Sequence, residues 1–441
     1  MDVVITPSPH PVSGALLLPA DKAICHRAAL VCALTQGSTE ITPWSSADDC
    51  QRTLEVLQQL GVRTTRTGEG IRVQGVGLKG LQAPHTDLFC GDSGTTMRLT
   101  AGLVAGQPFV SRLTADASLS RRPMRRIVEP LSHMGAQFEG VTRSSQEVYP
   151  PLVIRGQRPL RGFTYAMPLA SAQVKSAILL AGVFAERPVT IIEPIATRDH
   201  TERLLKRLGV SMRCTDCTIT LEPPLGEIAA PDQLVIPGDL SSAAFFVVAA
   251  VILPDSHVVI REVSLNPSRR HFLDVLTRMG AAIRWEVEDD GWEPRGTLTV
   301  TYKPLHGMTV AASEVPLLID ELPILMVAAC AAEGQSRFEG LGELRVKEAD
   351  RLRAMVMGLQ RLGAQVEFCG DAGVVITHSR LQGTSVDSVQ DHRTAMSLAI
   401  AGLVAEGQTR IQGAECVGKS LGNFFELLSS LTGPSVVKTV A

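Results

Sequence analysis

Aromatic residues are scarce in this chain of 441 residues: 12 Phe, 3 Trp and 3 Tyr make up 4% of it, whereas glycine numbers 38. A binding groove lined by aromatic rings is therefore not expected. Small residues let backbones approach one another closely, so the composition favours many tightly packed helices and strands. Hydrophobic residues at 45% and charged residues at 20% are ordinary for a globular protein. The length predicts about two to three domains.

Long apolar runs are also missing. The longest, residues 243–253, has 11 residues, whereas a helix that spans a bilayer needs about 20. The first residues, Met1 to Val4, lack the basic start and the apolar stretch of a secretory signal. The sequence therefore predicts no membrane partner.

Neither sign of charge dominates, because 42 Lys and Arg face 45 Asp and Glu, which gives a net charge of −3. This balance predicts that nucleic acid is not a partner, and it confines any positive field to a local cleft. The 9 cysteines are odd in number and scattered. They argue against a disulfide framework and favour a cytoplasmic protein.

A repeat is visible in the glycines that follow amphipathic helices. Each stands between a hydrophobic and a small aliphatic residue, and the five are Gly61, Gly135, Gly209, Gly280 and Gly363, with gaps of 74, 74, 71 and 83 residues. Glycine at such a point adopts the left-handed conformation that ends a helix. A second pattern, an Ala-rich apolar helix before a strand, occurs six times in register with the first, around residues 28, 101, 181, 249, 328 and 401.

Together these patterns predict six units, each reading helix–strand–helix–strand–strand. Six units of this size suggest two domains of three units. Turn-forming residues at 237–239 mark the midpoint of the chain. We expect one domain to contain residues 1–19 and 239–441 and the other to contain residues 20–238. Chance agreement among glycine-terminated helices is the alternative.

Polar and basic residues recur where each Ala-rich helix begins. The segments start at Asp21, Gly91, Ala170, Asp239, Asp320 and Asp391. The free N–H groups and partial positive charge of a helix N-terminus attract anions, and Lys22, Arg27, Arg98 and Arg393 add formal charge there. This pattern favours a shared site for anionic ligands. Ordinary helix capping by Ser, Asp and Thr is the alternative.

Two further motifs have competing interpretations. Cys214 and Cys217 form a CxxC pair, but no second pair or nearby His completes a zinc set, so a cysteine pair on a strand or hairpin is expected. Residues 344–352 read LRVKEADRL. Their spacing predicts that Lys347 and Arg351 share one face of a helix start, beside Glu348. A solvated charged surface is the alternative.

These segments resemble the motifs of the 5-enolpyruvylshikimate-3-phosphate (EPSP) synthases over the whole chain and in order. The matching segments are Lys22 to Arg27, Gly91 to Leu99, Ser118 to Met124, Ser171 to Lys175, Thr197 to His200, Asp320 with Glu321, Arg345 to Leu352, and Asp391 to Arg393. The LRVKEADRL run is highly specific. The runs around Gln173 and Arg198 are similar to the bacterial subclass often called class II.

The resemblance implies an α/β fold of two inside-out domains, each of three βαβαββ units, which close over an interdomain cleft. It implies transfer of the enolpyruvyl group of phosphoenolpyruvate to the 5-hydroxyl of shikimate 3-phosphate, with release of phosphate. It also implies no cofactor, no metal ion and a monomeric enzyme that is inhibited by glyphosate.

The resemblance assigns roles to individual residues. Phosphoenolpyruvate would be bound by Lys22, Gly94, Arg122, Gln173, Arg351, Arg393 and Lys419. Shikimate 3-phosphate would be bound by Lys22, Ala23, Arg27, Ser171, Ala172, Gln173, Arg198, Asp320 and Lys347. Asp320 would be the base for the 5-hydroxyl and Glu348 the acid and base for the methylene, with Lys22 assisting.

Three positions depart from the family pattern. Ala23 replaces a serine, Asp92 replaces an asparagine, and Ser420 begins a changed sequence after Lys419.

Three other functions stay open. One is that of the sister UDP-N-acetylglucosamine enolpyruvyl transferase, which has a cysteine where this chain has Ala117. A non-catalytic anion-binding homologue and a redox or metal protein built on the CxxC pair are the remaining alternatives.

Overall fold

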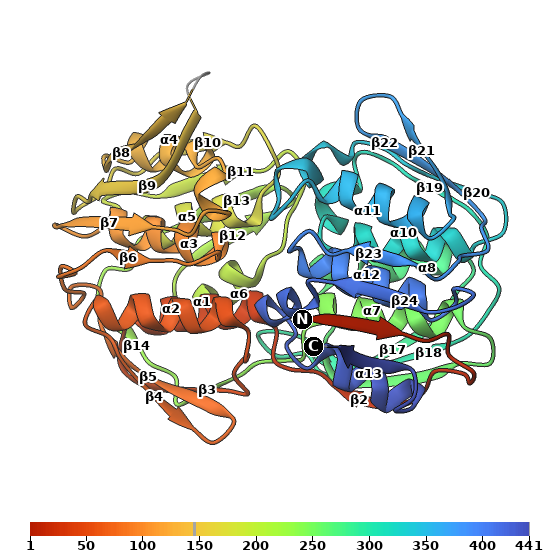
Figure 1. Ribbon diagram of the computed structural model, residues 1–441. Coiled ribbons are helices and arrows are strands. Elements are labelled where there is room, and N and C mark those ends of the chain that lie inside the picture. Colours follow the sequence, from red (N-terminus) through yellow and green to blue (C-terminus); the bar gives the residue numbers. More distant parts are fainter. Residues whose placement is uncertain (144–146, 441) are drawn as a thin grey trace. The chain divides into compact units, whose positions relative to one another are not determined.

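The computed structural model describes residues 1–143 and 147–440, and the chain divides into two compact units (Figure 1). The discontinuous unit contains Met1–Pro19 and the chain from Pro237 onward, and the continuous unit is Ala20–Ile236. The chain thus passes from one unit to the other after residue 19 and again after residue 236, two residues before the second boundary expected from the sequence.

The described residues of each unit form three sheets. In the continuous unit the strand orders are β6(Leu88–Phe89)-β7(Val110–Thr114)-β9(Glu147–Arg155)-β8(Gln137–Arg143), β10(Thr164–Ala166)-β11(Val189–Ile192)-β13(Thr218–Leu221)-β12(Met212–Thr215), and β14(Ile228–Ala229)-β3(Thr35–Thr42)-β5(Gly70–Val76)-β4(Arg63–Thr67), with β15(Gln233–Val235) also paired to β3. In the discontinuous unit they are β17(Ala282–Asp289)-β18(Arg295–Thr301)-β16(His257–Ser264)-β2(Ser13–Leu17), β19(Thr309–Val310)-β20(Gln335–Phe338)-β22(Gly373–Thr377)-β21(Gln365–Cys369), and β23(Ser385–Asp387)-β24(Thr409–Gln412)-β1(Asp2–Ile5)-β25(Val437–Val440).

The same topology recurs in all of these sheets. A short strand runs parallel to the strand after the first helix, and the remaining pairs are antiparallel. The segment β6-α3(Gly94–Ala105)-β7-α4(Arg125–His133)-β8-β9 is a complete βαβαββ repeat in chain order. Other βαβαββ repeats are completed by a strand from a distant part of the chain. β14 and β15 complete the first repeat, and β1 and β2 each complete a repeat of the discontinuous unit. These borrowed strands explain why residues 1–19 belong with the C-terminal half.

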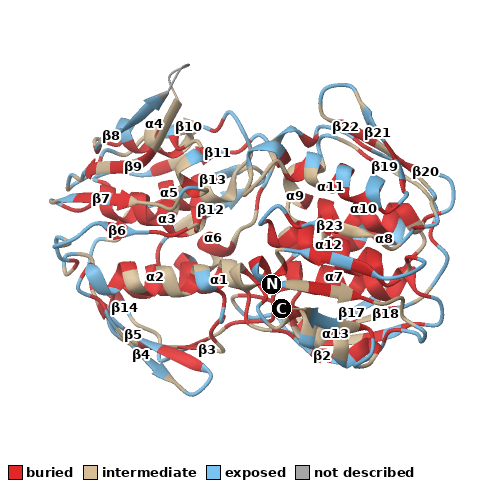
Figure 2. Ribbon diagram, in the orientation of Figure 1, coloured by how far each residue is buried: buried red, intermediate tan, exposed pale blue. Residues whose placement is uncertain are grey.

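Each unit is built around three inner helices. They are α1(Lys22–Cys32), α3(Gly94–Ala105) and α5(Ala172–Gly182) in the continuous unit, and α7(Leu240–Ile252), α10(Leu322–Ala331) and α12(His392–Gly402) in the discontinuous unit. They contact one another and are almost wholly buried (Figure 2). Beyond their first six residues these helices are apolar or small on all sides, so burial on all sides is the stable state of that part. The helices therefore lie inside and the sheets outside, which is the inside-out arrangement expected.

The outer helices follow the inner ones and bury only one side. They are α2(Asp48–Gln59), α4(Arg125–His133), α6(His200–Arg207), α8(His271–Arg278), α11(Arg351–Arg361) and α13(Phe424–Thr432). Five of them run into the glycines of the sequence repeat, whose φ angles lie between 81° and 114°. Left-handed glycine therefore ends these helices, as the repeat predicts.

One local prediction is wrong. Lys347 and Arg351 do not share the face of a helix start, because α11 begins at Arg351 and Lys347 lies outside it in an extended conformation after the 3-10 helix η3(Leu341–Val346). The Asp350 carboxylate accepts a hydrogen bond from the Arg353 N–H and fixes the start of the helix there.

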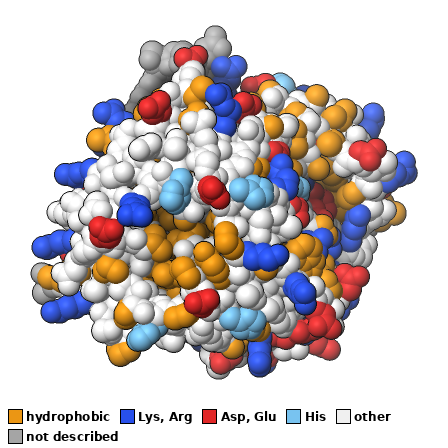
Figure 3. All heavy atoms as spheres, turned by 90° about the vertical axis from the view of Figure 1, so that its right-hand side faces the viewer, with side chains coloured by type: hydrophobic (Ala, Val, Ile, Leu, Met, Phe, Trp, Pro, Cys, Tyr) orange, Lys and Arg blue, Asp and Glu red, His pale blue; other side chains and the backbone are white. Residues whose placement is uncertain are grey.

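Across residues 1–143 and 147–440, no helix combines the length and the apolar composition needed to cross a bilayer. On the face drawn in Figure 3, basic and acidic side chains lie interspersed with apolar ones. This mixture agrees with the small net charge of the chain.

Candidate active site

Capping accounts for most of the polar residues at the inner helix starts. In the described chain, five of the six inner helices begin at an Asp or Ser whose side chain accepts a backbone hydrogen bond from the first turn: Asp21, Ser93, Ser171, Asp239 and Asp391. The exception is α10, which begins at Glu321 without such a bond. The capping interpretation is therefore correct for these residues, of which Ser171 is also a predicted ligand-binding residue.

In the continuous unit, two arginines converge on the N-terminus of α3. A Cβ atom placed on Gly94 would lie 3.0 Å from Nη1 of Arg122 and 3.3 Å from Nη1 of Arg98. Nη1 of Arg98 donates to Oε1 of Gln173 at 2.6 Å, and Nε2 of Gln173 donates to Oγ1 of Thr95 at 2.9 Å. Gly94, Arg122 and Gln173 are thus brought together, and the bare glycine leaves room for an anion at the helix start.

Acidic side chains accompany the cations of this unit. Nζ of Lys22 lies 3.0 Å from Oδ2 of Asp49, and both side chains are mostly buried. Nη2 of Arg122 lies 3.5 Å from Oδ1 of Asp92. The carboxylate that replaces the family asparagine therefore pairs with a predicted ligand-binding arginine.

The predicted shikimate 3-phosphate residues of this unit lie along α1, α5 and the start of α6. The buried Arg27 donates from Nε to Thr201 and from Nη2 to Ser176, both at 2.9 Å, and from Nη1 to the carbonyl of Ala23 at 2.8 Å. These bonds tie the three helices together. Ser171 and Ala172 begin α5, and Arg198 lies in the segment that leads into α6.

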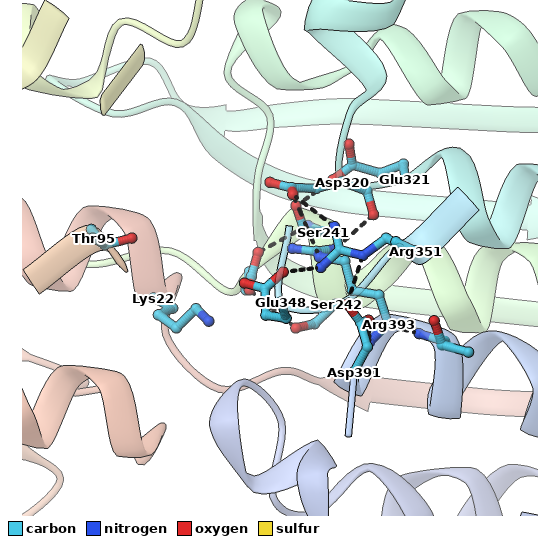
Figure 4. A network of polar contacts seen from close by, with 12 residues as sticks. Lys22, Thr95, Ser241, Ser242, Asp320, Glu321, Glu348, Arg351, Asp391 and Arg393 are labelled. Carbon is cyan, nitrogen blue, oxygen red and sulfur yellow. Dashed lines mark hydrogen bonds and ion pairs between the residues drawn. The ribbon is translucent and has the colours of Figure 1, made fainter. Parts of the chain in front are cut away.

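In the discontinuous unit, acidic side chains surround a buried guanidinium (Figure 4). We call Asp320, Glu348, Arg351, Asp391 and Arg393 the Arg351 cluster. Nε of Arg351 donates to Oδ2 of Asp391 at 2.9 Å, Nη2 donates to Oε2 of Glu348, and Nη1 lies 3.7 Å from Oδ1 of Asp320. Burial disfavours the charge of Arg351, but these carboxylates more than offset that effect and raise the pKa of the guanidinium.

Asp320 lies between two arginines. Its Oδ1 atom is 3.6 Å from Nε of Arg393 and 3.7 Å from Nη1 of Arg351, and its carbonyl oxygen accepts from Nη1 of Arg393 at 2.8 Å. The side chains of Asp320 and Glu348 are each 22% exposed, whereas that of Arg351 is 1% exposed. The two predicted proton-transfer groups are therefore the accessible members of the cluster.

Two lysines lie near the Arg351 cluster. Burial lowers the pKa of Lys347 to about 8, and the charge of Arg351 also lowers it, whereas Asp320 acts in the opposite direction. Lys419 ends the 3-10 helix η4(Ala414–Lys419), and its Nζ donates to the carbonyl of Gln390 at 3.1 Å, next to the start of α12.

Some residues that hold the site in place were not among the predicted site residues. Asp49 pairs with Lys22, Arg98 orients Gln173, and Asp391 binds Arg351 while it caps α12. Arg98 and Asp391 lie inside the motifs that resemble the family, so their position in the sequence could have indicated a role in the site. Asp49 begins an outer helix, where an acidic residue has an ordinary role as a helix-end charge.

The described residues contain no group of three His, Cys, Asp or Glu side chains arranged to hold a metal ion. Cys214 and Cys217 lie at the hairpin of β12 and β13, as the default interpretation of the CxxC pair predicts.

Comparison with known proteins identifies the family. The sequence profile described as EPSP synthase (3-phosphoshikimate 1-carboxyvinyltransferase) matches residues 7–428. The 3-phosphoshikimate 1-carboxyvinyltransferase of Roseiflexus sp. (strain RS-1) is 46% identical over 430 residues, which cover 96% of this chain and 98% of the relative. This chain belongs to the EPSP synthase family.

Other relatives agree with membership of the EPSP synthase family. The 3-phosphoshikimate 1-carboxyvinyltransferase of Endomicrobium trichonymphae is 42% identical over 95% of this chain and 97% of its own length. The solved structure of EPSP synthase from Acinetobacter baumannii superposes with a TM-score of 0.86 at 37% identity and covers the whole of both chains. The enolpyruvyl transferase NikO from Streptomyces tendae, with a TM-score of 0.80 and 18% identity, shares the fold.

Proposed function

We propose that this EPSP synthase family member transfers the enolpyruvyl group of phosphoenolpyruvate to the 5-hydroxyl of shikimate 3-phosphate and releases phosphate. The observation that carries the proposal is the Arg351 cluster, in which two accessible carboxylates, Asp320 and Glu348, are paired with a buried guanidinium. Relatives that match nearly the full chain bear the name of this reaction. They do not favour the UDP-N-acetylglucosamine enzyme, nor does Ala117, where that enzyme has a cysteine.

Anion repulsion is the first obstacle to this reaction. Each substrate brings a phosphate and a carboxylate, and the reacting atoms must come within bonding distance. Cations fixed in a water-poor site offset that repulsion without reorganising during the reaction. We assign phosphoenolpyruvate to Lys22, Gly94, Arg122, Gln173, Arg351, Arg393 and Lys419, and shikimate 3-phosphate to Lys22, Ala23, Arg27, Ser171, Ala172, Gln173, Arg198, Asp320 and Lys347.

Two proton transfers accompany the addition step. Asp320 takes the proton of the 5-hydroxyl of shikimate 3-phosphate, and the hydroxyl oxygen attacks C2 of phosphoenolpyruvate. Glu348 gives a proton to the methylene carbon, which becomes a methyl group. Asp320 suits the role of base because its carboxylate is exposed enough to meet a hydroxyl and is held between two arginines.

The elimination step reverses the second transfer. Glu348 takes a proton back from the methyl group, the bond between C2 and the phosphate oxygen breaks, and phosphate leaves. The proton that Asp320 took leaves with the phosphate, so both carboxyl groups return to their starting states. Lys22 assists by balancing the charge that develops on the departing phosphate. Contact with Arg351 keeps the carboxyl group of Glu348 in one place, protonated before the addition and ionised after it.

The remaining parts of the proposal concern the state of the enzyme in the cell. We infer a monomer that acts in the cytoplasm on small-molecule substrates without a cofactor. The scattered cysteines and the balanced charge of the chain support this inference.

Phosphorus NMR tests the chemistry directly. With the enzyme and both substrates, the phosphoenolpyruvate signal should give way to inorganic phosphate, while the 3-phosphate signal moves to that of a new ester and keeps its intensity. Loss of the 3-phosphate ester, or no change with fresh enzyme at high concentration, contradicts the proposal.

A further inference from the structure

A buried ion cluster lies behind the predicted shikimate 3-phosphate residues of the continuous unit. We call Lys175, Glu193 and Glu202 the Lys175 triad. Nζ of Lys175 lies 2.9 Å from Oε2 of Glu193 and 2.6 Å from Oε1 of Glu202. The three side chains are 1%, 1% and 4% exposed. Such burial of three ionisable groups is costly unless they are paired and hydrogen-bonded.

The ammonium of Lys175 has a third partner, the carbonyl oxygen of Thr197 at 3.2 Å. An ammonium carries three N–H donors, and these three acceptors account for all of them. Lys175 therefore has no N–H group left for a substrate, and any effect on the reaction must pass through the segments that it holds.

The segment held by the triad is residues 193–199, which forms neither helix nor strand. Its backbone polar groups need partners from elsewhere. The N–H of Thr197 donates to Oε2 of Glu193 at 3.4 Å, and the Thr197 hydroxyl donates to Oε1 of the same residue. Arg198 follows Thr197 directly, between this anchored point and the start of α6.

The three members of the triad come from three places. Lys175 is in the first turn of α5, which begins with Ser171, Glu193 follows β11, and Glu202 is in the first turn of α6. The ammonium thus fixes the Arg198 segment against the helix start that carries Ser171 and Gln173. Loss of the ammonium would free the segment while leaving Ser171 on its helix.

We propose that Lys175 is a positioning residue for shikimate 3-phosphate, which acts by holding the Thr197 carbonyl and thereby the side chain of Arg198. The inference rests on the proposed function, because Arg198 is assigned to shikimate 3-phosphate and not to phosphoenolpyruvate. It adds a residue that touches neither substrate and yet determines the affinity for one of them.

The first test is Lys175→Met, which keeps most of the side-chain volume and removes the ammonium. The KM for shikimate 3-phosphate should rise about tenfold or more, as expected when a charged hydrogen-bonding group is lost from position. The KM for phosphoenolpyruvate should change by less than about threefold. A rise of both KM values by the same factor overturns the proposal. Arg198→Gln is the benchmark and should show the same split.

A double variant separates positioning from stability. Lys175→Met alone leaves two buried carboxylates, although burial raises the pKa of Glu202 even in the presence of Lys175 and eases its protonation. Adding Glu202→Gln restores the net charge of the triad and should recover thermal stability. The KM for shikimate 3-phosphate should nevertheless stay raised, because the Thr197 carbonyl is still not held. Recovery of that KM together with stability contradicts the proposal.

A double-mutant cycle tests the route of the effect. If Lys175 acts through Arg198, Lys175→Met should add little to the KM of Arg198→Gln. Independent, multiplicative effects overturn the proposal. Should Lys175→Met not fold alone, the double variant with Glu202→Gln carries the same comparisons. The wild-type enzyme is assayed first: absence of phosphate release that depends on shikimate 3-phosphate rejects the proposed function, whereas normal release with no split in the variants rejects this inference alone.

Discussion

At the residue scale, the site is organised by how charges are shared among neighbours. Arg351 is bound by Asp391 from inside the protein and by Glu348 and Asp320 from the accessible side. A buried arginine with its own carboxylate can stay in place while the accessible carboxylates work as proton-transfer groups. The same arrangement predicts which substitutions affect chemistry and which affect folding.

The proton-transfer assignments predict the effect of two substitutions. Asp320→Ala and Glu348→Gln should each lower kcat by at least about 100-fold, because a positioned acid or base contributes 10²–10⁴-fold. Glu367→Gln, which changes an exposed carboxylate on β21 of the same unit, is the matched control. Thermal unfolding checks that the variants are folded. Near-normal turnover in either variant removes that residue from the mechanism.

The lowered pKa of Lys347 predicts that activity depends on pH. Burial, with Arg351, lowers the pKa of its ammonium to about 8, against the opposing effect of Asp320. The charged form therefore dominates below pH 8 and is lost as the pH rises above it. Because kcat/KM reports the free enzyme, kcat/KM for shikimate 3-phosphate should fall about tenfold per pH unit above pH 8. Lys347→Arg, which stays charged, should abolish this fall. Identical profiles for the two enzymes would exclude Lys347 as its source.

Gly94 predicts a selective loss of affinity. A methyl group there would press on the guanidinium of Arg122, which is the end of a flexible side chain, so the site should narrow without loss of stability. Gly94→Ala should therefore weaken glyphosate more than phosphoenolpyruvate, because the inhibitor is longer. Gly226→Ala, where an added Cβ meets no atom within 4 Å, is the control. Equal losses for both ligands, measured by steady-state inhibition, would refute the length argument.

At the element scale, the inner helix starts combine capping with charge placement. Asp391 accepts the N–H groups of Arg393 and Thr394 at 2.9 and 3.0 Å and also binds Arg351. One carboxylate thus fixes the start of α12 and the guanidinium beneath the site.

This double role predicts an order of stability among Asp391 variants. Asp391→Asn keeps a good capping group and an acceptor for Arg351, whereas Asp391→Ala loses a cap worth about 1 kcal/mol and leaves a buried charge less well paired. Thermal unfolding should rank the wild type above Asp391→Asn and Asp391→Asn above Asp391→Ala. Glu367→Ala, at an exposed position on β21, should change little. Equal stability of the alanine and asparagine variants contradicts the capping role.

Much of the element pattern could be predicted from the sequence, because glycine at a helix end and small residues on all helix faces leave clear signals. The strands that complete the sheets could not be predicted, because a strand as short as Leu88–Phe89 shows no alternation of buried and exposed residues. The position of Lys347 was missed for a related reason: a single cap at Asp350 moves the helix start past it. Contacts such as Lys22 with Asp49 depend on packing between helices, which spacing along the chain does not record.

At the scale of the whole molecule, the sixfold repeat places six inner helix starts in one chain. Each unit contains three inner helices of similar length, and several of the predicted site residues, among them Lys22, Gly94 and Arg393, lie in their first turns.

The central claim is that these helix starts bind phosphoenolpyruvate and shikimate 3-phosphate for enolpyruvyl transfer. Release of inorganic phosphate from phosphoenolpyruvate, measured with shikimate 3-phosphate, with UDP-N-acetylglucosamine and with no acceptor, tests it most directly. We predict steady release that depends on shikimate 3-phosphate and is at least about 100-fold slower in the Asp320→Ala enzyme. Release that needs UDP-N-acetylglucosamine, release without any acceptor, or no release at all would contradict it.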